Sequence, residues 1–420
     1  MRESTISVEE FRREARTWME GNLERRAPGQ RVVRPFGGGE TVEGLVVQRA
    51  EQRKLFDAGF AGITYPTEYG GRGLTPKHER AFNEEARDFV LPDLGVAGHV
   101  TMAPIGRSLV AHGSAELKAR HVPRILAGEE LWCQFYSEPE AGSDLAGIRT
   151  RATRDGERWI LNGSKIWSSG AHLADWAMCL ARTDWTVPKH RGLTWFAVPT
   201  KAAGVTVRQI RQINGNAEFC EEFLDDVEVT DADVIGEVNR GWAVTQTMLI
   251  YERGGGGAGG GRGEPRDLAP DLVKLARLVG RTDDPAARQA IAKAHVNDWA
   301  QYHLGRRMAA RLRATKTPDA SIAAYSKLAA GMLTPLRARL GLEVGGPAAL
   351  TWAEDSERGH LPALNYLNGR IVSIAAGTNE VQRNGIGERI LGLPREPSFD
   401  TNKPFDEVLR AAKNWDGRAG

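Results

Sequence analysis

This chain of 420 residues has few cysteines and no long apolar run, and each shortage excludes a class of protein. Its three cysteines, Cys133, Cys179 and Cys220, lie far apart and match no metal-ligand spacing. A small, odd number of cysteines excludes a disulfide framework and is typical of a reducing compartment. No apolar stretch approaches the roughly 18 residues that a membrane-spanning helix needs, so we expect no membrane span.

An excess of either charge sign is also missing. The chain has 56 Lys and Arg against 54 Asp and Glu, a net charge of +2, so no overall field attracts nucleic acid or an anionic membrane. The N-terminal stretch 1–23 is charged and has no apolar core of the kind that a secretory signal requires. We therefore expect a soluble, cytoplasmic protein with no nucleic-acid partner.

The secondary structure that the sequence predicts changes twice along the chain, from helical to β-rich and back to helical. Residues 1–130 read as helices with short breaks, beginning with the capping-box pattern Ser7–Glu10. Residues 131–237 are short β-rich runs between turn signals, where Asn162-Gly163 predicts a hairpin. Helical patterns return over 238–395, and a polar tail follows at 396–420. This order predicts a β domain between two helical domains, with a tail that is partly disordered or lies on another subunit.

A glycine-rich run interrupts the second helical region. Residues 254–263 contain eight glycines in ten positions. Because each glycine costs a helix about 1 kcal/mol relative to alanine, the helix that begins near Trp242 should stop there. The run is typical of a flexible linker.

The segment Trp132–Asp144 carries the strongest chemical pattern. An apolar run leads into Glu-Pro and then into a turn of small residues, Ala141 to Ser143. Backbone N–H groups and hydroxyls are thus offered at one point, which is how a protein holds a phosphate-bearing ligand against a strand.

Together with Asn162–Ser169 and Ala376–Arg383, the segment Gln134–Asp144 resembles the acyl-CoA dehydrogenases. The resemblance covers nearly the whole chain, and it is greatest to the actinobacterial type that acts on larger acyl thioesters. It implies a multidomain α+β fold with an N-terminal helical domain, a central β-barrel-like domain and a C-terminal four-helix bundle. It also implies FAD-dependent conversion of an acyl-CoA to the trans-2-enoyl-CoA in lipid metabolism, an electron-transfer flavoprotein as partner, and a homotetramer or a heterotetramer with a related subunit.

The resemblance also assigns flavin contacts residue by residue. Ser137 would hydrogen-bond the flavin ring, Trp167 would stack on it, and the Ser169 hydroxyl would reach it near N5. The cofactor-binding residues implied in this way are Gln134, Tyr136, Ser137, Gly142, Ser143, Trp167, Ser168, Ser169, Gly345, Gly346, Gly377, Thr378 and Asn379. Two of these assignments have structural alternatives, since Trp167 taken alone reads as a core tryptophan and Gly345-Gly346 reads equally well as a helix-terminating pair.

The position of the catalytic base departs from the majority pattern. Most family members place a glutamate directly before the Gly-Thr pair, where this chain has Ala376. A minority, resembling isovaleryl-CoA and long-chain dehydrogenases, places it on the first helix after the β domain, where this chain has Glu252. We therefore expect Glu252 to be the base, with Ser143, Arg253 and the backbone N–H of Ala376 binding substrate. The alternative is that Glu252 and Arg253 are a solvated charged pair at a helix end.

Other features leave competing readings open. The family's Arg-x-x-Phe-Gly element is replaced by Arg277–Asp284, which lacks Phe-Gly, so Arg277 or Arg281 would take its place. The chain could instead be a non-catalytic structural subunit of a heteromeric dehydrogenase. A third reading is a flavin oxidase or monooxygenase on the same scaffold.

Overall fold

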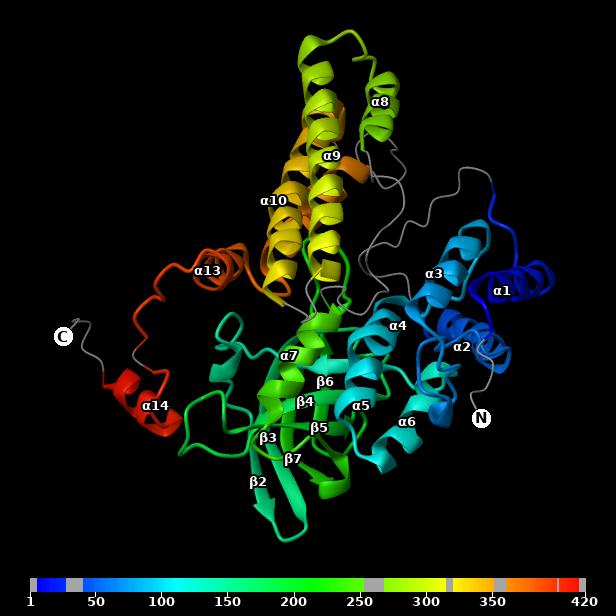
Figure 1. The fold of residues 1–420 in the computed structure, drawn as a ribbon. Coiled ribbons are helices and arrows are strands. Elements are labelled where there is room, and N and C mark those ends of the chain that lie inside the picture. The colour runs from blue at the N-terminus through cyan, green and yellow to red at the C-terminus, as the bar shows by residue number, and fades with distance from the viewer. Residues whose placement is uncertain are drawn as a thin grey trace. The chain divides into compact units, whose positions relative to one another are not determined.

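The computed structural model describes residues 6–27, 41–252, 268–314, 320–350, 360–398 and 400–414. The chain divides into two compact units, each described separately below (Figure 1). The first comprises residues 1–212, 216–258 and 398–420, and the second comprises 213–215 and 259–397. The N-terminal helices and the β domain therefore belong to one unit.

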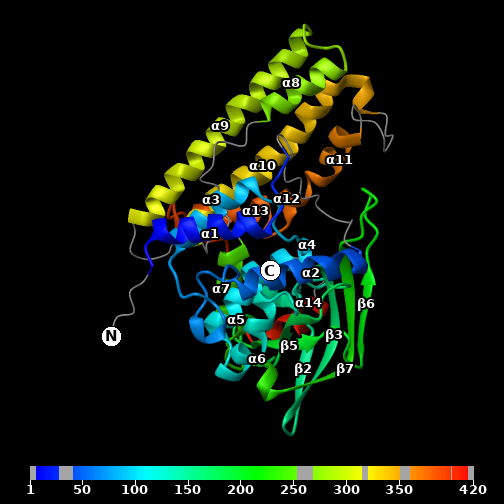
Figure 2. The ribbon, with the colours of Figure 1, turned by 90° about the vertical axis from the view of Figure 1, so that its right-hand side faces the viewer.

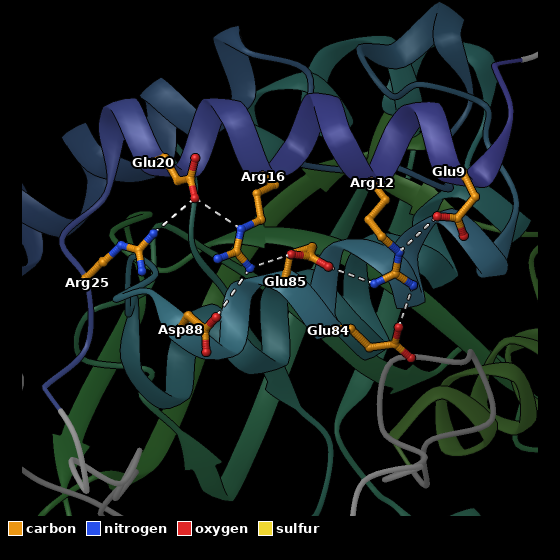
Figure 3. A network of polar contacts seen from close by, with 8 residues as sticks. All are labelled: Glu9, Arg12, Arg16, Glu20, Arg25, Glu84, Glu85 and Asp88. Atoms are coloured by element: carbon orange, nitrogen blue, oxygen red, sulfur yellow. Dashed lines mark hydrogen bonds and ion pairs between the residues drawn. The ribbon is translucent and has the colours of Figure 1, made fainter.

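Helices form the N-terminal part of the first unit. They are α1 (Val8–Asn22), α2 (Val42–Asp57), α3 (Pro76–Glu85), α4 (Gly95–Val100), a π-helical turn (Thr101–Ile105), α5 (Gly106–His112) and α6 (Ala115–Leu126). Helix α1 begins with the predicted capping box, in which the Ser7 hydroxyl accepts from the Glu10 backbone N–H and the Glu10 carboxylate accepts from that of Ser7. Figure 3 shows α1 tied to α3 by Glu85, whose two oxygens each lie 2.8 Å from an arginine, Arg12 or Arg16.

One eight-stranded sheet forms the centre of this unit. Its strands are β1 (Trp132–Phe135), β2 (Arg151–Asp155), β3 (Arg158–Ser169), β4 (Trp176–Arg182), β5 (Leu193–Pro199), β6 (Val205–Gln209), β7 (Phe219–Thr230) and β8 (Val234–Ile235). The order is β6-β7-β3-β2-β4-β5-β8, and β1 pairs in parallel with β4. Both faces are buried at β4, which directs Met178 and Leu180 into the core shared with the helices and Ala177 and Cys179 into a second core.

The predicted hairpin at Asn162-Gly163 is wrong. Both residues lie inside the continuous strand β3, which pairs with β7 along its length, and the turn between β2 and β3 is at Gly156, where φ is +61°. Gly163 instead occupies a break in register, and a Cβ there would lie 2.6 Å from Thr150 Oγ1. The glycine is thus required by close packing within a strand.

Residues 400–414 of the tail are described, and they belong to the first unit. Helix α14 (Phe405–Lys413) begins with Phe405, which is 3% exposed and lies under the Arg182 guanidinium at 3.9 Å from the ring centroid. Lys189 then joins the tail to the loop after β1, since its Nζ lies 2.6 Å from Asp400 and 2.8 Å from Asp144.

The second unit is helical. Its helices are α8 (Ala269–Leu278), α9 (Pro285–Ala314), α10 (Ala320–Gly345), α11 (His360–Asn368), α12 (Ile371–Ile374) and α13 (Asn379–Arg389). Figures 1 and 2 show the long helices α9 and α10 side by side. They enclose apolar side chains such as Ala294 and Leu340, and Asp298 of α9 forms an ion pair with Arg337 of α10. Of the helices in the described ranges, none has both the length and the hydropathy that crossing a membrane requires.

Candidate active site

Two segments singled out in the sequence lie side by side in the first unit. The end of β1 and the end of β3 are joined by three hydrogen bonds, each from a β3 residue to a backbone carbonyl of the β1 segment. These are Ile166 N to Ser137 O at 3.0 Å, Lys165 Nζ to Tyr136 O at 3.2 Å, and Ser168 Oγ to Gln134 O at 2.8 Å. The structure therefore brings together the two segments that the resemblance assigns to FAD.

A buried ion pair holds the loop that follows β1. The Glu138 carboxylate accepts from Lys165 Nζ at 2.9 Å and from the backbone N–H groups of Arg149 and Thr150 at 2.6 and 2.8 Å. Burial alone would raise the pKa of Glu138, but the Lys165 ammonium and the two N–H groups together hold it below its usual range. Loop 138–150 is thereby closed at its base, while Gly142 and Ser143 at its tip are exposed.

Trp167 adopts a conformation that a core tryptophan does not need. Its φ is +70°, at a break in register between Ile166 and Ser168. A non-glycine residue in this left-handed region costs roughly 1–2 kcal/mol, so the conformation requires a reason. The indole is 55% exposed and forms an edge contact with the Phe219 ring, at 6.0 Å between centroids. The reading of Trp167 as an ordinary core residue is therefore wrong, because the backbone is turned so as to present the indole outwards.

The two serines after Trp167 differ in their surroundings. Ser168 is 2% exposed, and its hydroxyl lies 2.8 Å from both the Gln134 carbonyl and Oε2 of Glu222. Ser169 is half-buried at the end of β3. The Ser168 hydroxyl thus faces the protein interior. Of the serines that the resemblance assigns to FAD, exposed Ser143 and half-buried Ser137 and Ser169 have surface to offer a ligand.

Helix α7 (Gly241–Glu252) packs against this site through one face. Trp195 Nε1 donates to the Gly241 carbonyl and the Thr245 hydroxyl, both at 3.1 Å, and Gln134 Nε2 lies 2.9 Å from the sulfur of Met248. Glu252 follows Met248 by four residues, so it lies on the same face of the helix, one turn further on. It is exposed and is the last residue described before the gap. Arg253 and the glycine run 254–263 lie outside the described residues.

The remaining predicted cofactor residues belong to the second unit. Ala376 and Gly377 form a turn with φ values of +53° and +90°, before the N-terminus of α13. Lys327 Nζ and Gln382 Nε2 hold this turn by donating to the Gly377 carbonyl at 3.1 and 3.2 Å. The Thr378 hydroxyl caps α13 by accepting from the Val381 N–H. Asn379 packs against α10 at Gly331, where an added Cβ would lie 2.0 Å from its Oδ1.

The glycine pair at the end of α10 lies against an arginine. Helix α10 ends at Gly345, Gly346 follows with a φ of +57°, and a Cβ at Gly346 would lie 2.7 Å from Arg281 Nη1. Arg281 donates to two carbonyls of the last turn of α10 and pairs with Asp284. Arg277, the other candidate, is exposed on α8. Both the helix-terminating role of the pair and its proximity to Arg281 are therefore present.

Three charged residues of the site were missed by the sequence analysis. They are Glu138, Lys165 and Glu222, which are 7%, 1% and 0% exposed. A signal existed for two of them, because Lys165 and Glu222 occupy inward positions of strands that otherwise alternate between apolar and polar residues. The residues are also register partners across β3 and β7.

Known proteins share this architecture. The chain matches the acyl-CoA dehydrogenase N-terminal, middle and C-terminal domain models over residues 7–129, 133–227 and 239–391. It is 39% identical to acyl-CoA dehydrogenase IpdE1 of Mycobacterium tuberculosis, over 93% of this chain and 98% of that one. Among solved structures, the Tcur3481-Tcur3483 steroid ACAD superimposes with a TM-score of 0.71 at 28% identity, covering 94% of this chain and 99% of that one. The ChsE4-ChsE5 complex from M. tuberculosis gives 0.70 at 27%, covering 94% and 100%.

The domain matches run through both units, and they include Gln134–Asp144, Asn162–Ser169, helix α7 and the turn before α13. The helical N-terminal region, the central sheet and the helical C-terminal region follow one another in the order that the three domain models have. This chain is therefore an oxidoreductase that belongs to the acyl-CoA dehydrogenase family.

Proposed function

We propose that this protein catalyses FAD-dependent α,β-dehydrogenation of an acyl-CoA thioester to the trans-2-enoyl-CoA, with Glu252 as the base. The observation that supports this most directly is the position of Glu252 on α7. It extends the helix face that contacts Gln134 of the first flavin segment through Met248. The majority position for the base holds Ala376, which has no proton acceptor in its side chain.

The residues of the first unit suit FAD. A large planar ring needs an aromatic face and a few well-placed donors. Trp167 offers a 55% exposed indole, and the hydroxyls of Ser137, Ser143 and Ser169 lie on the two segments that β1 and β3 bring together. In the second unit, Gly345-Gly346 and the turn before α13 are the proposed contacts for the rest of the cofactor. The chemistry that bound FAD supplies is acceptance of the hydride that leaves the substrate Cβ.

The protein's own residues must handle the proton. The hydrogen on Cα of a thioester is weakly acidic, so a carboxylate has to reach it while the carbonyl oxygen is hydrogen-bonded. In this proposal Glu252 takes the proton at its carboxylate. The backbone N–H of Ala376 donates to the thioester oxygen, a role that needs no side chain, and Ser143 and Arg253 bind the CoA part.

The relatives support a class of substrate and a form of assembly. One similar solved structure is named a steroid ACAD, and we propose that the acyl group here is likewise bulky. Electrons would pass to an electron-transfer flavoprotein, and the assembly would be a homotetramer or a heterotetramer with a related subunit. Two solved structures with chains named in pairs, Tcur3481-Tcur3483 and ChsE4-ChsE5, favour a second candidate function, in which this chain is the structural subunit of a heteromeric dehydrogenase.

Purification of this chain alone separates the two candidates. An enzyme should be yellow and should lose its flavin colour anaerobically when mixed with one member of a panel of acyl-CoA thioesters, from short straight chains to steroid side chains. A colourless protein that acquires flavin only when expressed with a related subunit would refute independent catalysis. Rapid formation of peroxide on reoxidation would instead indicate an oxidase.

A further inference from the structure

Behind the two flavin segments lies a carboxyl group that the proposed mechanism does not use. Glu222 projects from β7 into the interior, where it is 0% exposed. Its Oε2 lies 2.8 Å from the hydroxyl of Ser168, and that hydroxyl lies 2.8 Å from the backbone carbonyl of Gln134. A chain of three groups therefore connects the interior of the sheet to both flavin segments.

The Ser168 hydroxyl has one proton but lies within hydrogen-bond distance of two oxygens, so it can donate either to the Gln134 carbonyl or to an ionised Glu222. Both contacts are hydrogen bonds at the same time only if Ser168 donates to Gln134 and a protonated Glu222 carboxyl donates to Ser168. The other oxygen, Oε1, is buried and has no hydrogen-bond partner among the described residues. A charge on that oxygen would be far more costly than a neutral carbonyl.

The charges around Glu222 also favour its protonated form. The register partner of Glu222 is Lys165. The Lys165 ammonium, however, points to Glu138, and its Nζ lies 2.9 Å from Oε1 of Glu138. One buried cation is thus already matched by one carboxylate, and a second carboxylate would have no counter-ion. Burial, the largest effect, raises the pKa of Glu222 to about 8, and the neighbouring Glu221 adds to it; the hydrogen bond that Ser168 can donate to the ionised carboxylate and the charge of Lys165 act against it.

Three described thiols and one described histidine near the Glu222 site have shifted pKa values, and none of these four groups changes charge in the same range. The thiols are those of Cys133 on β1, Cys179 on β4 and Cys220 on β7. Burial raises the pKa of Cys133 well above its usual value, that of Cys179 to about 12 and that of Cys220 to about 11. His172 Nδ1 lies 3.5 Å from the sulfur of Cys220. Burial lowers the pKa of His172, so its ring is neutral in the pH range where Glu222 loses its proton.

We propose that Glu222, in its protonated form, is a positioning residue for FAD: its proton leaves the Ser168 hydroxyl free to donate to the Gln134 carbonyl, and loss of this proton removes one of the three hydrogen bonds that join the end of β3 to the end of β1. An ionised Glu222 would accept the Ser168 proton, so the Gln134 carbonyl would lose its donor. Trp167, held in a strained conformation directly before Ser168, would then be free to relax. This inference rests on the proposed binding of FAD at these segments.

Titration of FAD binding against pH tests the proposal. The dissociation constant of FAD is measured by flavin fluorescence from about pH 6.5 to about pH 9.5 for wild type, Glu222→Gln, Glu222→Ala and Ser168→Ala. We expect wild type to lose affinity about tenfold across this range. Gln retains a donor for Ser168 but cannot ionise, so Glu222→Gln should match wild type at the lower pH and show no loss. The comparison removes the titration of the flavin itself, which is common to all variants.

The two remaining variants and a second readout complete the test. Glu222→Ala and Ser168→Ala should bind FAD weakly at every pH. Infrared difference spectra between wild-type and Glu222→Gln apoprotein should contain the band of a protonated carboxyl at about pH 6.5 that disappears at about pH 9.5. An alkaline loss of affinity that persists in Glu222→Gln, or no such band, would overturn the proposal. The infrared readout needs no FAD, so it distinguishes a failure of this inference from a failure of the proposed function.

Discussion

The hydroxyl of Ser168 lies 2.8 Å from the backbone carbonyl of Gln134, and the two residues come from segments 34 positions apart. Lys165 Nζ and the Ile166 backbone N–H donate to the carbonyls of Tyr136 and Ser137 in the same segment. The proposed flavin site of the first unit is therefore formed where two strand ends fit together. Substitutions at the buried residues that contact these strand ends, such as Lys165 and Glu222, should therefore weaken FAD binding as strongly as substitutions at the exposed residues proposed to touch the cofactor.

Substitution of Trp167 should separate the strain of its backbone from the use of its ring. Trp167→Gly and Trp167→Ala both remove the indole, so both should weaken FAD binding by a similar factor, about tenfold or more. Only glycine relieves the φ of +70°, so the Gly variant should be more stable than the Ala variant by about 1 kcal/mol in chemical unfolding of the apoprotein. Equal stabilities, or wild-type affinity for FAD in either variant, would contradict this account.

Removal of Lys165 should be severe, because it leaves Glu138 buried and unpaired. We expect Lys165→Met to lower the free energy of unfolding by about 3–5 kcal/mol. Adding Glu138→Gln should restore part of this loss, since the neutral amide needs no counter-ion. Lys201→Met, at an exposed lysine, is the matched control and should stay within about 0.5 kcal/mol of wild type. A double variant less stable than Lys165→Met would disprove the charge argument.

The stability of the apoprotein should also depend on pH through Glu222. Its pKa is about 8 in the folded state and about 4.3 in the unfolded state, so the folded state binds one more proton between these values. The stabilisation is fully present at low pH and is lost as the pH rises to about 8, with a slope of at most about 1.4 kcal/mol per pH unit from this group. Urea unfolding of Glu222→Gln at a series of pH values should lack that slope. Parallel curves for the two proteins would rule the assignment out.

Two glycines of α10 should respond in opposite directions to alanine. At Gly331 a Cβ would lie 2.0 Å from Asn379 Oδ1, so Gly331→Ala should destabilise the second unit by about 1–3 kcal/mol and disturb the start of α13. At Gly341 a Cβ would meet nothing within 4 Å, so Gly341→Ala should stabilise it by up to about 1 kcal/mol. Thermal unfolding of both variants checks this, and a stable Gly331→Ala protein would contradict the packing of Asn379 on α10.

Local signals in the sequence predicted much of this fold. The capping box at Ser7 and the alternation of helical and β-rich segments depend on neighbouring residues, and both are confirmed. The Asn162-Gly163 hairpin failed because a turn preference of two residues is outweighed by the pairing of β3 with β7 on both sides of it.

The interior of the site could not be predicted in the same way. Whether Lys165 pairs with Glu138 or with Glu222 depends on where the loop after β1 lies relative to β3, a long-range feature. The left-handed conformation of Trp167 is likewise imposed by its surroundings, since no property of tryptophan favours it. The sequence therefore singled out two segments that the structure places side by side, but it did not predict the contacts that join them.

The most direct test of the proposed function is the anaerobic reduction of bound flavin by an acyl-CoA substrate in Glu252→Gln. The amide cannot accept a proton, so the variant should retain FAD while its rate of flavin reduction falls by about a thousandfold. Glu237→Gln, at an exposed glutamate just before α7, is the control and should reduce flavin at the wild-type rate. A wild-type rate in Glu252→Gln would show that this carboxylate is not the base.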